Sequence, residues 1–346
     1  MLNAAYVRIG AIESFTSLSW GREYSACGKV ELELLEDPSG LLQVGNFLLH
    51  GEEAAVSEQV VHTYEEDGPK IEVNGRRLLG LLDRRIVYPD YSATAPPDAL
   101  LVGLVNANAV EDTARALNGL SARSDVSEAL DALEAHVDRG ESLLDAVEEL
   151  AQDSQLGIDM AFVDASPLFR VYQGQQRRGV FAEEFDNLLS VEYDESDESY
   201  RNVAYVAGRE DRDTGAYLLV QVGEAQGNER RETWIRANDV ERDEDGNTRP
   251  EAEQLELMTA KGRQELANLP PVHSLCAEVN PYGNLVYRRD YDLGDIVPLR
   301  VDRYGVRMMA RITGIVEIYE EESLSLEITF GNGYLTMSKR IKKGVL

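Results

Sequence analysis

One phrase is written twice in this sequence, once near each end, and this repeat limits the possible folds more than any other feature. Residues 60–68 read VVHTYEEDG and residues 315–323 read IVEIYEEES, so a valine, a tyrosine and two glutamates recur in the same relative places. A Gly-Asn or Gly-Asp turn and an apolar strand precede each copy, in LLQVGNFLL (41–49) and YDLGDIVPL (291–299). Repeated supersecondary patterns usually mean that one small fold is built twice. Convergence is the alternative, because valine-rich strands followed by acidic turns are common.

Strand signals surround both copies and indicate the fold class. The segment KVELELL (29–35) alternates apolar and charged residues, which is the period-two pattern of a strand with one buried face. We therefore predict a mainly β chain with a helical insertion: two related small β-barrels and a mixed α/β middle region. The predicted parts are an N-terminal barrel (1–105), the middle region (106–275) and a C-terminal barrel with a basic tail (276–346). The second copy requires a longer first hairpin than the first.

The middle region changes to a helical period. Two apolar stripes predict two helices, one through Val126, Leu130, Leu133 and Val137 and one through Leu143, Val147 and Leu150. Gly140 separates them, and Ser142 with Asp145 resembles the start of a capped helix. Further predictions are a short helix within 75–89, a proline linker around 89–97, strands over about 157–237, and a helix that closes before Pro270 and Pro271.

Composition excludes several classes of protein. The chain has 63 acidic and 34 basic residues and a formal charge of −29, so its surface repels phosphates and sequence-reading DNA binding is disfavoured. Cys27 and Cys276 are far apart, which predicts two reduced, buried thiols rather than a disulfide or a thiolate metal site. No signal peptide or membrane span is expected. Almost all bases are arginine, which suits a high-salt host or, equally, a GC-rich genome.

No catalytic, cofactor or metal site emerges from the motifs. The four histidines are scattered, and GxSxG, Walker and GxGxxG patterns are absent. Residues 241–252 imitate a calcium loop through Asp243 and Asp245, but Glu241 and Ala252 stand where the first and the bidentate twelfth ligands belong. With so many acids, no carboxylate pair can be singled out for glycoside hydrolysis. Trp20 and Trp234 lie in strand-like segments, which predicts core positions for both.

Five segments, taken in order, resemble the tail-hub or tail-associated proteins at the distal end of the tails of long-tailed phages. They are SLSWGREYSACGKVELEL, VNGRRLLGLLDRRIVYP, GVFAEEFDNLLSVEYDESDESYRNVAYVAG, ETWIRANDV, and YDLGDIVPLRVDRYGVRMMARITGIVEIYEEESLSLEITFGN. The resemblance implies two related barrels in one chain and a homotrimer, whose six barrels seat on a six-fold tail tube while presenting three-fold symmetry to the tip. Since the sequence ends soon after LEITFGN, we expect no peptidase or fibre-like extension.

The same resemblance implies the surroundings of the protein. They are the distal-tail or tail-tube protein, the tape-measure protein, tip-fibre or receptor-binding proteins, DNA only in passage, and no membrane insertion. The expected location is the distal end of the virion tail, after assembly in the host cytoplasm. The expected role is structural rather than enzymatic, and no cofactor is expected. Alternatives from other classes are a tail-associated glycosidase or peptidase, and a protein that binds carbohydrate of the host envelope.

Two basic clusters are candidates for contacts with other subunits. Arginine favours ion pairs at interfaces, and four arginines bracket the leucines of GRRLLGLLDRRI: Arg76, Arg77, Arg84 and Arg85. The tail SKRIKKGVL adds a second cluster: Lys339, Arg340, Lys342 and Lys343. The alternatives are a surface helix whose arginines pair within the chain, and a frayed, solvated terminus.

Overall fold

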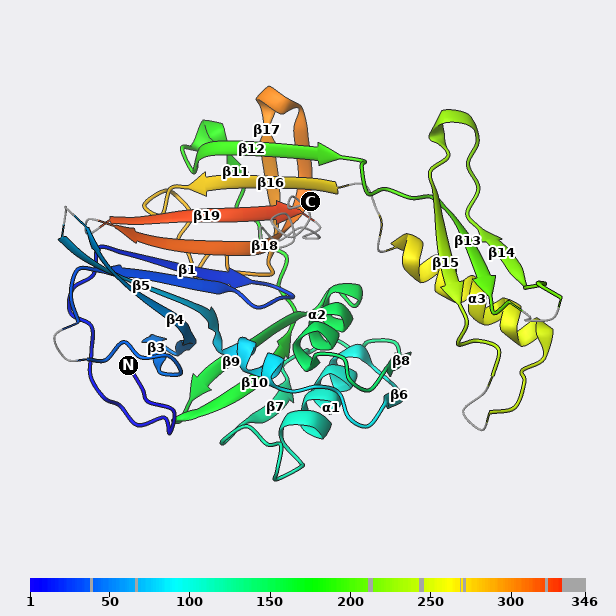
Figure 1. Ribbon diagram of the computed structural model, residues 1–346. Helices are drawn as coiled ribbons and strands as arrows, with labels where there is room; N and C mark the ends of the chain where they lie inside the picture. The colour runs from blue at the N-terminus through cyan, green and yellow to red at the C-terminus, as the bar shows by residue number, and fades with distance from the viewer. Residues whose placement is uncertain are drawn as a thin grey trace. The chain divides into compact units, whose positions relative to one another are not determined.

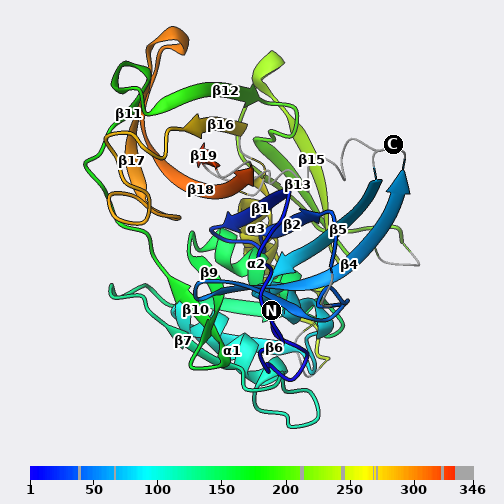
Figure 2. The same cartoon turned by 90° about the vertical axis from the view of Figure 1, so that its left-hand side faces the viewer.

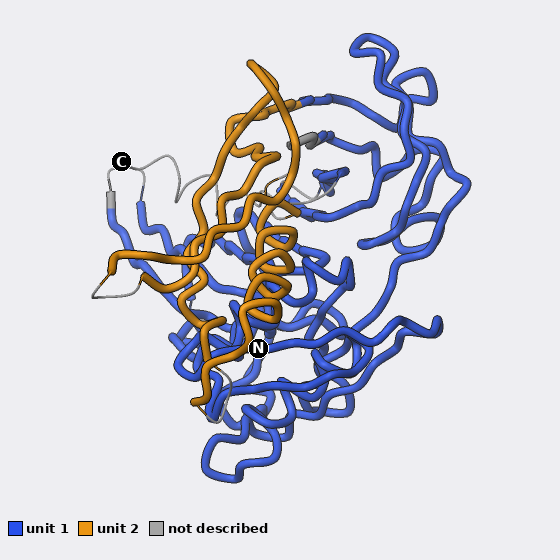
Figure 3. The backbone as a smooth tube through the Cα atoms, turned by 90° about the vertical axis from the view of Figure 1, so that its right-hand side faces the viewer, with its two compact units in different colours: residues 1–193, 275–346 blue, residues 194–274 orange. Residues whose placement is uncertain are grey.

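The computed structural model describes residues 1–37, 40–65, 68–210, 214–242, 246–267, 269, 272–320 and 323–331. The chain forms two compact units, which Figure 3 colours separately. Unit 1 comprises residues 1–193 and 275–346, and unit 2 comprises residues 194–274. None of the helices within these described ranges is both long and apolar enough to cross a membrane.

One large, mostly antiparallel sheet forms the framework of unit 1 (Figure 1). Its N-terminal strands are β1 (Ser17–Glu23), β2 (Lys29–Leu34), β3 (Phe47–His50), β4 (Glu53–Glu65) and β5 (Gly68–Arg77). Its later strands are β11 (Phe181–Ala182), β12 (Leu188–Ser196), β16 (Val272–Val279), β17 (Ile296–Val301), β18 (Val306–Glu320) and β19 (Ser323–Gly331). The hydrogen-bonded order is β12-β16-β19-β18-β1-β2-β5-β4-β3, with β17 on β18 and β11 on β17.

The sheet contains the same five-stranded set twice. The order β1-β2-β5-β4-β3 in the first set corresponds to β12-β16-β19-β18-β17 in the second. We call these sets the first and second repeat. The buried residues also correspond: Val30, Leu32, Leu34, Ile71 and Val73 in the first repeat, and Leu275, Ala277, Val279, Leu326 and Ile328 in the second. Period-two burial on one face thus gives each repeat an apolar core of its own.

The repeated phrase ends the long strand of a hairpin in both repeats, in the same register. Glu65 pairs with Gly68 in the hairpin β4-β5, and Glu320 pairs with Ser323 in the hairpin β18-β19. A β-bulge interrupts each hairpin at the same point, between Ser57 and Gln59 in β4 and between Ile312 and Gly314 in β18. Bulges are specific local features. Their shared position supports duplication over convergence.

The glycine turn before each repeat's outer strand is also the same. Gly45 and Gly294 both have a φ of 88°, in the left-handed region that favours glycine. The N–H of Gly45 donates to the carbonyl of Ser57 and that of Gly294 to the carbonyl of Ile312, both at 2.8 Å. The following hairpin is longer in the second repeat, where β17 and β18 pair from Ile296–Arg311 to Val301–Val306, as the sequence predicts.

A helical layer lies between the repeats in the sequence and completes unit 1. It contains the 3₁₀ helix η1 (Leu78–Arg84), β6 (Tyr91–Ala95), α1 (Pro97–Ala109), β7 (Ser121–Ser124), β8 (Leu133–Val137), α2 (Leu143–Asp153), β9 (Gly157–Val163) and β10 (Ser166–Tyr172). Figure 2 shows α1 and α2 beside β9 and β10. Apolar residues from η1, both helices and both strands share one core, among them Leu82, Leu104, Val147, Ile158 and Phe169.

One helix prediction and the linker prediction fail here, and two helix predictions are confirmed. The stripe that begins at Val126 is not a helix, because Leu133–Val137 forms β8 and pairs with β6. The predicted linker contains the start of α1, since proline is tolerated in the first helical turn, where its missing N–H is not needed. Helix α2 is confirmed: the Ser142 Oγ accepts a hydrogen bond from the Asp145 N–H at 3.4 Å. The predicted short helix near 75–89 is η1.

Unit 2 is a small sheet covered by one helix. Strand β13 (Val203–Gly208) lies between β14 (Leu219–Val222), which is antiparallel to it, and β15 (Glu232–Ala237), which is parallel. Helix α3 (Glu251–Ala267) packs on this sheet around the buried Met258, as the predicted loop and helix before Pro270 require. Gly262 permits this packing, because a Cβ there would lie 2.7 Å from the Val222 side chain.

The prediction of a mainly β chain with a few helices is confirmed. The predicted closure of each repeat into a barrel stays a prediction, as does the division into 1–105, 106–275 and 276–346.

Candidate functional site

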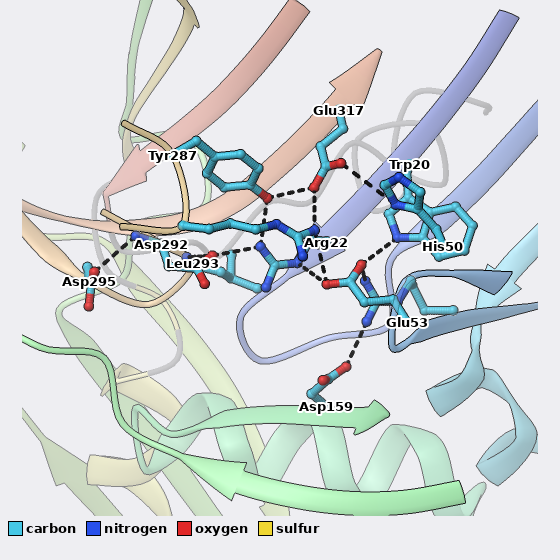
Figure 4. Close-up of polar contacts among 12 residues, drawn as sticks. Trp20, Arg22, His50, Glu53, Asp159, Tyr287, Asp292, Leu293, Asp295 and Glu317 are labelled. Atoms are coloured by element: carbon cyan, nitrogen blue, oxygen red, sulfur yellow. Dashed lines mark hydrogen bonds and ion pairs between the residues drawn. The ribbon is translucent and has the colours of Figure 1, made fainter. Parts of the chain in front are cut away.

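The two repeats meet where β1 of the first pairs with β18 of the second. The pairing is antiparallel and runs from Ser17 opposite Glu320 to Glu23 opposite Gly314. It places Trp20 opposite Glu317 and makes one continuous sheet out of the two sets. Charged side chains gather beside this pairing (Figure 4). We call this group the junction cluster; its members are Arg22, Glu53, Arg77, Asp159, Arg170, Arg288, Asp292 and Glu317.

Glu53, at the start of β4, is the acid at the centre of the junction cluster. Its side chain is buried, and its carboxylate lies 3.0 Å from the Arg22 Nε and 2.6 Å from the Arg77 Nη1. The Trp20 Nε1–H donates to the same carboxylate at 2.7 Å. The Arg77 guanidinium also lies over the Trp20 ring, 5.7 Å from its centroid. Buried charges are costly unless they are paired and hydrogen-bonded, and these contacts satisfy that requirement.

Glu317, on β18, is the buried acid that the second repeat contributes to the cluster. It accepts hydrogen bonds from the Arg288 Nη2, the Tyr287 hydroxyl and the Tyr319 hydroxyl, each at 2.7 Å. Burial alone would raise the pKa of Glu317, but the hydrogen bonds from Arg288 and the two tyrosines lower the pKa below its usual value. The ring of His50 approaches from the first repeat, with its Nδ1 3.8 Å from the carboxylate.

The cluster continues on both sides of these two acids. The Arg22 Nη1 lies 2.6 Å from Asp292, which belongs to the turn before β17. On the other side, Arg77 bridges to Asp159 on β9 at 2.9 Å, and Arg170 on β10 contacts the same carboxylate at 2.7 Å. Burial raises the pKa of Asp159, yet Arg77 and Arg170 outweigh it and the pKa is lowered. The cluster therefore connects both repeats and the helical layer.

The geometry of this arrangement is that of a structural joint. Glu53, Glu317 and Asp159 are each held by at least one guanidinium. Within the described residues, no group of three His, Cys, Asp or Glu side chains could hold a metal ion. These contacts hold the two repeats in one fixed arrangement relative to each other.

The sequence-based search did not find the junction cluster. The sequence contains one signal: Glu317 lies two residues after the buried Ile315, so a charged residue occupies the apolar face of its strand. Its partner Arg288 lies in an irregular segment, which has no such periodicity. Glu53 begins a strand 264 positions before Glu317. Only the fold brings these residues together.

The predicted arginine candidates lie near the cluster but have different surroundings. Arg77 is buried in the joint, and Arg76 pairs with Glu58 and Asp83 at 2.8 and 3.0 Å. Arg85 donates to the carbonyl of Arg115, whereas Arg84 is exposed. A role for these four residues in contacts between subunits stays a prediction. The candidates Lys339, Arg340, Lys342 and Lys343 lie outside the described residues, as do Asp243 and Asp245 of the calcium-like loop.

The two tryptophans and the two cysteines have unequal environments. Trp20 is 1% exposed, so its predicted core position is confirmed. Trp234 is 53% exposed on β15, where that prediction is wrong because its face of the small sheet is not covered by α3. Both thiols are free, as predicted. Cys276, however, is exposed rather than buried, while burial beside Glu148 raises the pKa of the half-buried Cys27 to about 12.

Three solved tail proteins have a similar fold. Prophage tail protein gp18 from Listeria monocytogenes EGD-e gives a TM-score of 0.59 at 10% identity, covering 99% of this chain and 96% of that one. The tail protein from Neisseria meningitidis MC58 gives 0.59 at 11% identity, with 93% and 94% covered. The 43 kDa tail protein of prophage MuSo2 from Shewanella oneidensis gives 0.59 at 11% identity, with 93% and 96% covered. Identities this low show a shared fold alone.

Sequence comparison adds one match. The family described as Siphovirus ReqiPepy6 Gp37-like protein matches residues 1–332, which is nearly the whole chain. No curated protein sequence matches at a significant level.

Proposed function

Because the chain belongs to the Siphovirus ReqiPepy6 Gp37-like family and shares the fold of a prophage tail protein, we propose that it is a structural protein of a phage tail and forms the hub of the tail tip. In this proposal three copies form a ring at the distal end of the tail. The ring seats on the six-fold tail tube, presents three-fold symmetry to the tip, and surrounds part of the DNA exit path. Its neighbours are the distal-tail or tube protein, the tape-measure protein and the fibre or receptor-binding proteins.

The observation that carries this proposal is the duplicated five-stranded set. The two repeats share strand order, hairpin register, bulge position and glycine turn. Three chains with two such repeats each offer six similar surfaces, which is what a six-fold partner requires of a three-fold ring. Each repeat closing into a small barrel is part of the proposal.

The junction cluster supports the same role. A ring that imitates six-fold symmetry needs its two repeats held at one fixed angle within the chain. Glu53 and Glu317, buried and bound by arginines from both repeats, supply such a constraint. In this proposal the buried ion pairs fix the orientation of the two repeats. They are not its main source of stability, since buried ion pairs add little net stability compared with apolar packing.

The charge of the chain fits a passage for DNA. With a formal charge of −29, carboxylates facing the channel of the ring would repel the phosphates of exiting DNA rather than bind them. The same lysine-poor, acidic surface fits a high-salt host, and maximal stability in molar KCl would support that reading. A neutral or basic channel in a structure of the assembled ring would contradict the repulsion.

Native mass spectrometry and electron microscopy of the purified chain test the hub directly. We expect a homotrimer, and averaged top views that show six similar densities around a central opening. A stable monomer or dimer at micromolar concentration, with tail neighbours added, would overturn the proposal. Absence of turnover on cell-wall peptides and glycans is expected in the same preparation, whereas cleavage would favour the glycosidase or peptidase alternative.

One observation favours carbohydrate binding as a second candidate function. The exposed Trp234 lines an open hollow of about 360 Å³ in unit 2 together with Tyr217, Arg209, Arg236 and Asn238. The ring of Tyr217 meets the Trp234 ring edge-on, with centroids 6.3 Å apart. An exposed aromatic ring beside polar side chains suits a sugar face. Titration with host-envelope glycans would quench tryptophan fluorescence in the wild type and not in Trp234→Ala if this function is present.

A further inference from the structure

One edge of the first repeat lacks the strand that covers the same edge of the second. In β18, residues 314–320 pair with β1. The shared hairpin register and bulge make residues 59–65 of β4 the counterpart of that segment. Among the described residues, the outer edge of β4 pairs with β3 over Glu53–Val56 only, and no strand pairs with it beyond the bulge.

The burial of corresponding side chains shows the effect of the missing strand. Glu317 is 2% exposed, whereas its counterpart His62 is exposed. Tyr319 is half-buried, whereas its counterpart Tyr64 is 85% exposed. An open strand edge beside exposed aromatic residues is a site for pairing with another chain, and natural proteins normally cover or block such edges.

The strand that would fit this edge lies at the other end of the same sheet. β12 is the terminal strand, and it has the place in the second repeat that β1 has in the first, next to β16 as β1 is next to β2. β1 has a second neighbour, β18, whereas β12 pairs with β16 alone among the strands that the structure describes. On β12 the apolar side chain of Leu189 is 56% exposed. The chain thus carries one uncovered edge and one strand of the type that covers it.

The register of β12 follows from the first repeat. Burial makes Val279, the last residue of β16, the counterpart of Leu34. On β12, Val191 and Tyr193 pack against the core of the second repeat, as Leu18 and Trp20 on β1 pack against the core of the first. The charge of Glu192 acts on the thiol of Cys276, the counterpart of Glu31, and Glu31 pairs with Ser19 in the first repeat. Val191 therefore corresponds to Leu18.

We propose that β12 of one chain adds, antiparallel, to residues 59–65 of β4 in the next chain, with Val191 opposite Tyr64. This pair corresponds to Leu18 opposite Tyr319 within the chain. The contact is head-to-tail, so repetition around an axis closes a ring in which every edge is covered. The inference rests on the proposed hub, and it identifies the surfaces that join its subunits. A second copy is the occupant because the chain's own β1-β18 pairing already shows this sheet accepting this strand position.

Engineered disulfides test the register. The background variant is Cys276→Ser, which removes the exposed thiol, while the raised pKa of Cys27 keeps that thiol protonated and unreactive. Val191→Cys with Tyr64→Cys is compared with Val191→Cys with Thr63→Cys, in which the second cysteine points to the opposite face of β4. Circular dichroism and melting of the reduced variants confirm that both fold before oxidation.

The expected product after oxidation is a covalent trimer on a non-reducing gel, at least about tenfold more abundant for the Tyr64 pair than for the Thr63 pair, because a disulfide tolerates little misplacement. A mixture of the two single-cysteine proteins should give dimers only. A native trimer that cross-links no better through Tyr64 than through Thr63 would overturn the edge pairing and leave the hub standing. An open ladder of covalent polymers would support the pairing and overturn the closed trimer, and a monomer that does not cross-link would overturn both.

Discussion

Glu53 and Glu317 share one cation: the Arg288 Nη2 lies 3.3 Å from the first carboxylate and 2.7 Å from the second. The two acids belong to different repeats, so this guanidinium is a direct link between them. Arg22 and Arg77 complete the pairing on the side of Glu53. The joint between the repeats is therefore electrostatic at its centre and apolar on either side.

Removing Glu53 should destabilise the protein strongly. Glu53→Ala leaves Arg22 and Arg77 buried without their main partner, and breaking a buried ion pair in this way costs about 3–5 kcal/mol. The matched control is Glu58→Ala, which removes a more exposed partner of Arg76 and should cost about 1 kcal/mol or less. Urea unfolding at neutral pH measures both free energies. Equal losses for the two variants would contradict a special role for the joint.

Glu317 should make the protein sensitive to acid. Its pKa is lowered in the folded state, so its stabilising contribution is full above the unfolded pKa of about 4.3 and is lost as pH falls through the folded pKa. In Glu317→Gln this part of the pH dependence should disappear, and the melting curves of variant and wild type should converge as the pH falls through the lowered, folded-state pKa of Glu317. A constant difference between the two proteins at all pH values would show that the carboxylate does not titrate as described.

Glu23 should have the opposite pH dependence. Burial, reinforced by the charge of Glu148, raises the pKa of Glu23 to about 7, so folding is favoured while this acid is protonated and opposed as pH rises from about 4.5 through 7. Glu23→Gln should therefore be more stable than the wild type at pH 8, by about 1–3 kcal/mol, and similar to it at pH 4.5. Glu31→Gln, at an exposed position on β2, serves as control and should change neither value. Loss of stability at pH 8 in Glu23→Gln would refute the prediction.

The two equivalent glycines allow backbone strain and steric overlap to be separated. A Cβ on Gly45 would meet no atom within 4 Å, so Gly45→Ala costs only the left-handed conformation, about 1–2 kcal/mol. A Cβ on Gly294, at the same φ, would lie 2.3 Å from the ring of Tyr24. Gly294→Ala should therefore lower the melting temperature clearly more than Gly45→Ala. Equal effects would mean that the Tyr24 ring moves aside freely.

The sequence alone predicts the mainly β character of the chain and the presence of the repeat. Period-two alternation in β2 and the repeated phrase at the ends of β4 and β18 are local signals, and the structure contains the strands that they predict. The helix predicted from Val126 failed because apolar spacing alone does not separate a helix from a loop followed by a short strand. The exposure of Trp234 depends on which face of a sheet a helix covers, and that is a tertiary property.

The junction cluster could not be derived in the same way. Its members come from β1, β4, β5, β9, β10, β18 and the segment before β17, and the attraction between the repeats exists only after they have paired. The ion pairs of Arg76 and Arg77 within the chain are those that the alternative reading of this segment predicts. The sequence pattern does not distinguish Arg77, whose side chain points inward to Glu53 and Asp159, from Arg76, which lies near the surface.

The position of unit 2 within the second repeat has an evolutionary consequence. In the first repeat, β1 and β2 are joined by the short segment 24–28, while in the second the corresponding strands β12 and β16 are neighbours in the sheet but are separated in sequence by unit 2. A module whose two ends join adjacent strands can be gained, lost or exchanged without re-threading the sheet. A lineage of such chains can therefore exchange this inserted unit for another while the sheet that carries both repeats stays unchanged.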